Sequence, residues 1–278
     1  MHRIPDELLS RQVDVVVVGC GGTGSAVAQE LVWLHQALIA YGHPGGLQVT
    51  FCDGATVSET NCVRQAFTQA EIGQYKATII ATRINHFFGL RWGAITQDLP
   101  VGHVMGAPGG DPAADIVIGC VDTAQARLRI HEAVTSAASR TCYWLDCGNG
   151  STQGQILLGE PANGRTRKRP NRLPTAAEKW WDDGIIDPSK DVDLGPSCSA
   201  AESLTRQGPM VNRSIAVHAV NLLARLFRTG GLEWHGQFIN LATGLDTPIL
   251  VPAAVPPPSA ARAAKPRRAA GRAGGGAG

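Results

Sequence analysis

The chain has few aromatic residues, few charged residues and no hydrophobic run long enough to cross a membrane. Aromatic side chains make up 5% of the 278 residues and charged ones 17%, whereas 44% are hydrophobic. This is the composition of a globular chain with a large core. The longest apolar runs have the length of a strand, and the first residues are charged and include a proline, unlike a signal peptide. We therefore expect a cytoplasmic protein with no membrane partner.

Cysteine pairs with the spacing of a zinc site are also missing. The seven cysteines are Cys20, Cys52, Cys62, Cys120, Cys142, Cys147 and Cys198. No two of them are separated by two residues, which is the spacing that zinc-binding pairs commonly show. Most lie within or beside apolar runs, so we expect reduced, buried thiols and no structural zinc.

Glycine and proline are abundant, but many of them fall in the last segment of the chain. Residues 251–278 have no apolar periodicity, carry five basic residues and contain no acidic one. Such a composition is typical of disorder, so we predict one domain over residues 1–250 and a disordered tail over 251–278. Without the tail the formal charge changes from +2 to −3. A specific nucleic-acid partner is therefore not expected.

Buried strands alternate with helices along residues 1–250. The strands are expected at Val13–Val18, Leu47–Cys52, Asp115–Cys120, Cys142–Asp146, Gln155–Leu158 and Gln237–Leu241, and the helices at Ser25–Ala40, Tyr75–Phe88, Ala124–Ala138 and Met210–Phe227. This alternation predicts a Rossmann-like, doubly wound, mainly parallel α/β sheet with helices on both faces. Some antiparallel strands are expected toward the C-terminus. Residues 160–196 lack clear periodicity, which indicates an irregular crossover loop that is functional or mobile rather than a linker.

A glycine-rich turn joins the first strand to the first helix. It contains Gly19, Gly21, Gly22 and Gly24. Such a turn lets a phosphate approach the backbone, and the N–H groups of the following helix bind it. Asp53, at the end of the second strand, is placed to accept hydrogen bonds from a ribose. These residues fit either ATP or NAD.

The residues that follow Asp53 favour ATP. Asn61, Arg64, Gln65 and Lys76 lie within 25 residues of it. A reaction at the α-phosphate needs fixed cations for the charge on pyrophosphate, and Arg64 and Lys76 offer them. Asp122 ends the next buried strand and is a candidate ligand for Mg²⁺.

These motifs resemble the ThiF/MoeB-type adenylating enzymes, which include the ubiquitin-activating enzymes. The GxGGxG turn of that family is similar to residues 19–24, its ribose-binding Asp to Asp53 and its SNxxRQ segment to residues 60–65. Its Lys that contacts the triphosphate matches Lys76, and its Asp with an Arg five residues later matches Asp122 and Arg127. Residues 59–65 and 196–204 also resemble ThiF-like proteins of the bacterial plasmid cassettes called PRTRC.

The resemblance implies an ATP- and Mg²⁺-dependent enzyme that adenylates the C-terminal carboxylate of a small ubiquitin-like protein. Arg64, Lys76 and Asp122 would be catalytic, Asn61 and Gln65 would belong to the nucleotide site, and Arg127 would brace the Asp122 loop. Cys198 is the candidate that would accept the acyl group as a thioester, before a conjugating-enzyme-like acceptor. A homodimer is also expected by analogy. An NAD-dependent oxidoreductase and a non-catalytic nucleotide-binding scaffold are the alternatives.

Overall fold

The computed structural model of the protein describes residues 1–99, 114–180, 186–191, 208 and 210–253, apart from the side chains of Arg64 and Lys190. The predictions for Cys198 and for the tail from residue 254 onward lie outside these residues. The strands are β1 (His2–Arg3), β2 (Val13–Val18), β3 (Leu47–Cys52), β4 (Gly93–Ile95), β5 (Ile116–Gly119), β6 (Tyr143–Asn149), β7 (Gln153–Gly159), β8 (Gly231–Leu232), β9 (Trp234–Asn240) and β10 (Leu245–Leu250). The helices are α1 (Glu7–Ser10), α2 (Gly22–Ala40), α3 (Asn61–Arg64), α4 (Lys76–Phe88), α5 (Ala124–Thr135), α6 (Ala176–Trp180) and α8 (Val211–Thr229), with short 3₁₀ turns at Gln69–Glu71 and Pro188–Lys190.

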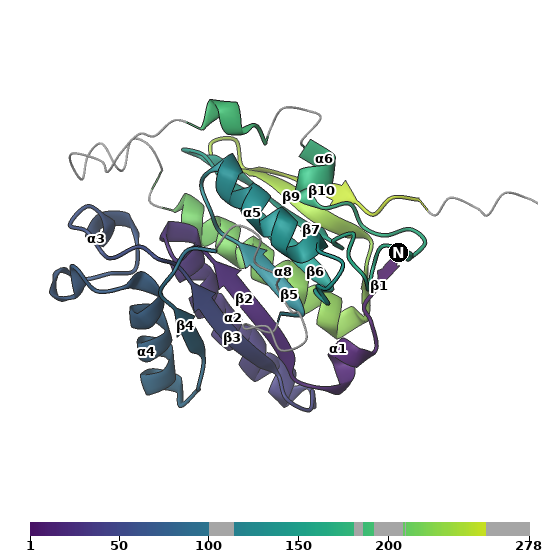
Figure 1. The fold of residues 1–278 in the computed structure, drawn as a ribbon, viewed down its shortest axis with the longest axis horizontal. Helices are drawn as coiled ribbons and strands as arrows, with labels where there is room; N and C mark the ends of the chain where they lie inside the picture. Colours follow the sequence, from purple (N-terminus) through teal and green to yellow (C-terminus); the bar gives the residue numbers. More distant parts are fainter. Residues whose placement is uncertain (100–113, 181–185, 192–207, 209, 254–278) are drawn as a thin grey trace, which may run out of the picture.

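An eight-stranded sheet organises the fold (Figure 1). Its strand order is β10-β9-β7-β6-β5-β2-β3-β4. The neighbouring strands β6, β5, β2, β3 and β4 pair in parallel, and β7, β9 and β10 extend the sheet with antiparallel pairing. The predicted Rossmann-like sheet, mainly parallel with antiparallel strands toward the C-terminus, is confirmed.

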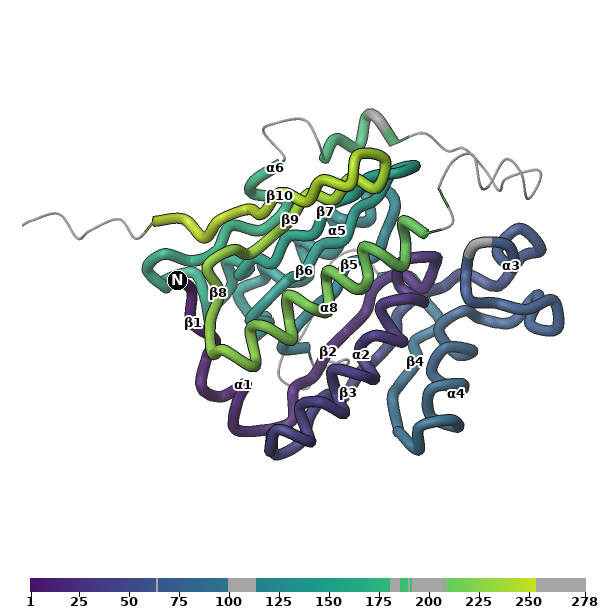
Figure 2. The backbone as a smooth tube through the Cα atoms, turned by 180° about the vertical axis from the view of Figure 1, so that it is seen from behind, coloured from purple at the N-terminus to yellow at the C-terminus, as the bar shows by residue number. Residues whose placement is uncertain are grey.

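Helices cover both faces of this sheet. Helices α2, α4 and α8 lie on the face shown in front in Figure 2, and α5 and α6 lie on the opposite face, in front in Figure 1. Along β2, Val13, Val15 and Val17 belong to the core under α2 and α8, whereas Val16 and Val18 belong to the core under α5. The continuous apolar run of this strand therefore follows from burial on both faces.

Most predicted elements lie where the sequence placed them, and the differences are local. The strands Val13–Val18 and Leu47–Cys52 have the predicted bounds. Helix α2 begins at Gly22, inside the glycine turn, and α5 ends at Thr135 instead of Ala138. The short strand β4 and the outer strand β10 were not predicted. Strand β10 is mostly exposed and contains Pro248, so it lacks the apolar alternation that identifies a half-buried strand.

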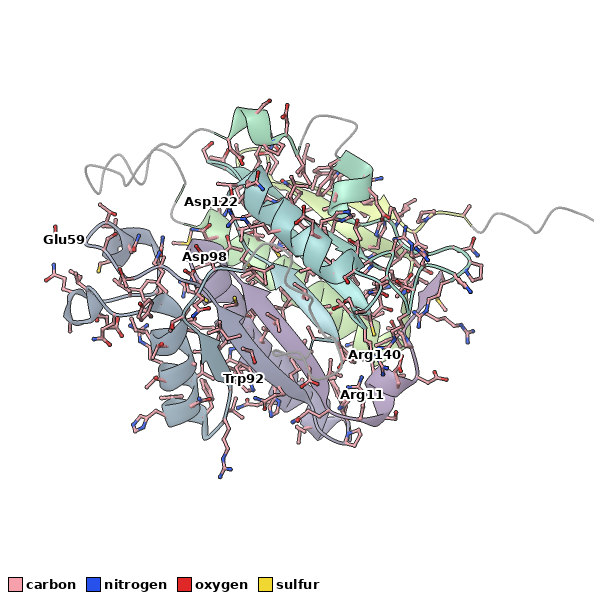
Figure 3. All side chains as sticks on the ribbon, viewed as in Figure 1. Arg11, Glu59, Trp92, Asp98, Asp122 and Arg140 are labelled. Atoms are coloured by element: carbon pink, nitrogen blue, oxygen red, sulfur yellow. The ribbon has the colours of Figure 1, made fainter. Side chains whose placement is uncertain are left out.

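The two ends of the sheet carry different side chains. Asp98 and Asp122 lie together at the end where the parallel strands finish, and Arg11 and Arg140 lie at the opposite end (Figure 3). Arg11 forms a bidentate salt bridge with the buried Asp115, with nitrogen–oxygen distances of 2.6 and 2.7 Å. The polar groups available to a ligand thus gather at the carboxyl end of the sheet. Of the helices that the structure describes, none combines the length and apolar character needed to cross a membrane.

The first part of the predicted crossover loop is attached to the domain. Buried Glu160 accepts hydrogen bonds from the backbone N–H of Leu173 at 3.0 Å and from Arg169 at 2.8 Å. Farther along, both oxygens of Asp191 accept hydrogen bonds from the first N–H groups of α5, those of Ala124 and Gln125. The loop is therefore attached, at Asp191, beside the carboxyl end of the sheet.

Candidate functional site

A cleft of about 390 Å³ lies at the carboxyl ends of β2, β3 and β5. Three residues of the glycine turn line this cleft: Gly19, Gly21 and Gly22. Ligands of open α/β sheets bind at this edge, where the connections leave toward opposite faces. The predicted residues that line the cleft in addition to these glycines are Asp53, Gln65, Lys76 and Asp122.

The glycines of the turn are required by its geometry. Gly19 has a φ of +90°, and a Cβ there would lie 2.7 Å from the carbonyl oxygen of Cys120. A Cβ on Gly24 would overlap the carbonyl oxygen of Gly19, so Gly24 serves close packing and does not line the cleft. Helix α2 begins at Gly22 without a side-chain cap. Its first N–H groups are therefore available to a ligand, as a phosphate site requires.

Asp53 connects the end of β3 to the glycine turn. Its Oδ2 accepts a hydrogen bond from the backbone N–H of Cys20 at 2.5 Å, and its Oδ1 accepts one from the N–H of Ala55 at 2.7 Å. Each carboxylate oxygen can accept a second hydrogen bond. Asp53 can thus hold the turn and still accept a hydrogen bond from a ribose hydroxyl.

Lys76 and Asp122 face the cleft from opposite sides. Lys76 is the first residue of α4, and Asp122 precedes Thr123, whose side chain caps α5 by accepting from the N–H of Ala126 at 3.1 Å. Neither charged side chain has a hydrogen bond or ion pair with another described residue. Both charges therefore remain available to a ligand.

The segment after β3 orders the loop that carries Arg64. Asn61 Oδ1 accepts a hydrogen bond from the N–H of Ser58 at 3.0 Å, and the carbonyl oxygen of Asn61 accepts one from the N–H of Gln65 at the same distance. Gln65 lines the cleft, whereas Asn61 does not. The side chain of Arg64 and all of Cys198 lie outside the described part of the chain.

Arg127 does not line the cleft. Its Nε lies 3.1 Å from Oδ1 of Asp146 on β6, and it therefore anchors α5 to the sheet. Burial raises the pKa of Asp146, and the Arg127 guanidinium acts in the opposite direction. This pair keeps the start of α5, and with it the Asp122 loop, against the sheet edge.

Several residues of the cleft were not predicted from the sequence. Among them are Thr23, Arg129, Asn149 and Asn212. Within the described residues, three residues that line the cleft each have a buried side-chain atom without a hydrogen-bond partner: Gln65 (Oε1), Arg129 (Nε) and Asn212 (Nδ2). Buried polar atoms without partners are uncommon and indicate a place for a ligand or water. No local pattern marks these residues, because they come from helices and strand ends that meet only in the fold.

Three of the buried cysteines are poor nucleophiles. Burial raises the pKa of Cys52 to about 12 and that of Cys20 well above its usual value. Burial also raises the pKa of Cys142 to about 12. A thiol with a raised pKa stays protonated at neutral pH, and the thiolate is the reactive form. These three cysteines are therefore unsuited to accept an acyl group.

A family model describes nearly the whole chain. The model of the ThiF family matches residues 6–248. The chain belongs to the ThiF family. The predicted family is confirmed, and the match includes the glycine turn, Asp53, Lys76 and Asp122. A search of curated proteins by sequence found no match.

Solved structures share this fold at low sequence identity. The structure of E. coli MccB with ATP has a TM-score of 0.52 and 15% identity over 90% of this chain and 66% of that one. E. coli MccB with succinimide gives 0.54 and 15%, over 86% and 63%, and PaaA gives 0.53 and 12%, over 86% and 64%. The chain thus spans slightly less than two thirds of the length of these structures.

Proposed function

We propose that this ThiF-family chain is an ATP-dependent activating enzyme that adenylates the C-terminal carboxylate of a small ubiquitin-like protein. The observation that carries the proposal is the cleft at the glycine turn, which combines an unpaired lysine, carboxylates and buried polar atoms without partners. Family membership and the similarity to an MccB structure with ATP support it. Another similar MccB structure holds AMPCPP together with MccA, which supports a second substrate beside the nucleotide.

The reaction is an attack at the α-phosphorus. One oxygen of the substrate carboxylate forms a bond to this phosphorus, and the bond to the oxygen that bridges to the β-phosphorus breaks. The electron pair of that bond leaves with pyrophosphate, and an acyl adenylate remains. The attacking oxygen is already an anion, so the enzyme has to position the reactants and stabilise charge.

The residues of the cleft divide this work. The glycine turn and the start of α2 bind phosphate oxygens through backbone N–H groups. Asp53 accepts a hydrogen bond from the ribose, and Lys76 and Arg64 stabilise the charge that builds on the phosphates. Asn61 orders the loop that carries Arg64, and Gln65 supplies a polar contact in the cleft.

The residues also fit a magnesium ion bound with ATP. Mg²⁺ in nucleotide sites takes one or two protein carboxylates together with phosphate oxygens and water. The unpaired carboxylate of Asp122 at the cleft matches that requirement. In the described residues no group of three or more His, Cys, Asp or Glu is placed to hold a metal by itself. The ion would neutralise phosphate charge, and Asp122 would hold it on the α5 side.

The ubiquitin-like substrate and the second step rest on the sequence. The likeness of residues 59–65 and 196–204 to PRTRC ThiF-like proteins supports a ubiquitin-like partner and a conjugating-enzyme-like acceptor. Cys198 would take the acyl group from the adenylate as a thioester, with release of AMP. The protein would act in the cytoplasm, and a homodimer is part of the proposal by analogy with the family.

ATP–pyrophosphate exchange tests the function. The full chain is incubated with ATP, labelled pyrophosphate, Mg²⁺ and the ubiquitin-like protein of the same cassette. We expect label to enter ATP only when the partner keeps its free C-terminal carboxylate, and a partner with an amidated C-terminus is the control.

Two results would overturn the proposal. NADH binding without ATP binding would favour an oxidoreductase, which shares the glycine turn and Asp53. Binding of ATP and partner with no exchange would favour a non-catalytic scaffold.

A further inference from the structure

Three polar side chains from distant parts of the sequence form one cluster at the cleft. Thr23 lies in the first turn of α2, Asn149 ends β6 and Asn212 lies in the first turn of α8. The Thr23 hydroxyl donates to Asn212 Oδ1 at 3.1 Å, and Asn149 Nδ2 donates both to Thr23 Oγ1 at 2.9 Å and to Asn212 Oδ1. We call these three residues the asparagine cluster.

The cluster fixes the orientation of the Asn212 amide. Its oxygen is the common acceptor, so its nitrogen must point the other way. Asn212 is 3% exposed, and Nδ2 has no hydrogen-bond partner among the described residues. This nitrogen lies against Gly22, where a Cβ would overlap it. A buried donor of this kind costs free energy unless a ligand satisfies it.

The cluster and the nucleotide residues lie on opposite sides of the glycine turn. The turn follows β2, Asp53 follows β3, and Lys76 begins the helix that packs near β3 and β4. Asn149 belongs to β6, which lies two strands from β2 in the other direction, and α8 packs on β6 and β7. A nucleotide held by Asp53 and Lys76 therefore does not occupy the side of the glycine turn where the asparagine cluster lies. That side is available to the second reactant.

We propose that Asn212 Nδ2 binds one oxygen of the acyl substrate's carboxylate and positions the other oxygen for attack on the α-phosphorus. This inference rests on the proposed adenylation. The bound oxygen is a carboxylate oxygen before the reaction and the carbonyl oxygen of the acyl adenylate after it, so the same hydrogen bond serves both states. A neutral amide holds the carboxylate without the strong charge pairing that would weaken its attack.

A set of stable ligands tests this position without knowledge of the protein substrate. The probes are ATP, 5′-O-sulfamoyladenosine and 5′-O-(N-glycylsulfamoyl)adenosine, which mimics an acyl adenylate and alone carries the acyl oxygen. Calorimetry measures their affinity for the full chain and for N212A and N212D. N212D keeps the shape and the oxygen that Thr23 contacts but loses the donor. N221A is the matched control, because Asn221 is an exposed residue of the same helix outside the cleft.

We expect N212A and N212D to bind the glycyl compound about tenfold more weakly, since one hydrogen bond to a buried group is lost. The affinity of N212A for ATP and for sulfamoyladenosine should stay within about twofold of the unmodified chain. For N212D the comparison is with sulfamoyladenosine, which has no phosphate, because a carboxylate beside Gly22 would repel the triphosphate of ATP. N221A should bind all three compounds normally. Thermal unfolding of each variant reports folding, and N212D provides the readout if N212A does not fold.

The other outcomes overturn the inference in distinguishable ways. For N212A, equal losses for all three ligands would assign Asn212 to the part they share, the nucleoside and the position of the α-phosphate or of the sulfamoyl group that replaces it. Unchanged affinity for the glycyl compound would leave the cluster a purely structural role. If the unmodified chain binds neither ATP nor the glycyl compound, the proposed adenylation itself fails, and the inference fails with it.

Discussion

Arg127 Nε lies 3.1 Å from Oδ1 of Asp146, and the Asp146 side chain is 1% exposed. The pair joins α5 to β6 behind the cleft. A charge in such a place is costly when its partner is removed. We therefore expect Arg127→Met to lower the free energy of unfolding by about 3–5 kcal/mol. Urea unfolding followed by circular dichroism measures it.

The double variant Arg127→Met with Asp146→Leu separates the cost of an unpaired buried charge from the cost of lost packing. Because the unpaired carboxylate is then gone, we expect the double variant to regain part of the stability that Arg127→Met alone loses. Arg140→Met, at an exposed arginine, is the control. An Arg127→Met protein as stable as the unmodified one would contradict the proposed anchoring.

Lys76 provides the sharpest test of charge stabilisation. Lys76→Ala and Arg64→Ala should each leave the fold intact and lower the rate of pyrophosphate exchange by about 10²-fold or more, since each removes a preorganised cation. Lys168→Ala removes an exposed lysine outside the cleft and should leave the exchange rate unchanged. Near-normal exchange in both site variants would refute their assigned roles.

Cys198 is the proposed acceptor of the acyl group. The full chain, ATP and the ubiquitin-like partner should give a conjugate that is visible on non-reducing gels and is cleaved by thiols. Cys198→Ala should abolish this conjugate while pyrophosphate exchange persists. Cys142→Ala is the control, because burial raises the pKa of that thiol to about 12. Absence of any conjugate with the unmodified chain would restrict the enzyme to adenylation.

Four histidines, of which His235 is buried and the others partly buried, predict a loss of stability in mild acid. Burial lowers the pKa of His2, His35, His131 and His235 from 6.5. Below that value the unfolded chain binds more protons than the folded one, so the free energy of unfolding falls as the pH decreases from about 7.5 to about 5.5. Urea unfolding across this range measures the slope.

His2 allows a single-site check of that slope. Its Nε2 lies 2.7 Å from the hydroxyl of Tyr143, and its Nδ1 lies 3.7 Å from a carboxylate oxygen of Glu160. His2→Gln removes one titrating group, so the dependence on pH should become shallower. His86→Gln, at an exposed position, is the comparison. A slope that is zero or reversed in the unmodified chain would contradict the prediction.

The tail should be dispensable for folding and for exchange. The last described strand ends at Leu250, and the N–H of Val251 donates to the carbonyl oxygen of Glu233. A chain that ends at Ala253 should therefore keep its Tm and exchange rate, whereas one that ends at Thr243 loses β10 and should melt earlier. Weak polyanion binding by the tail should decrease steeply with salt. Unfolding of the chain that ends at Ala253 would show that the domain extends past residue 253.

The sequence by itself determined the elements and the motif residues that are local in the chain. The β-branched run before Gly19, the glycines and the amphipathic helices are encoded by neighbours a few residues apart. For this reason the strand, turn and helix around Gly19 were predictable, as were Asp53 and Lys76 at the cleft. The exposed strand β10 was not, because it lacks the apolar alternation on which such a prediction depends.

Only the tertiary structure decided which distant polar groups complete the site. Thr23 and Asn212 are 189 residues apart and Asn149 lies 63 residues before Asn212, yet they share hydrogen bonds at the cleft. Nothing in the local sequence of α8 distinguishes Asn212 from the exposed Asn221 of the same helix. The difference arises when β6 pairs beside β5 and α8 packs on α2, since burial then removes water from one amide and leaves the other solvated.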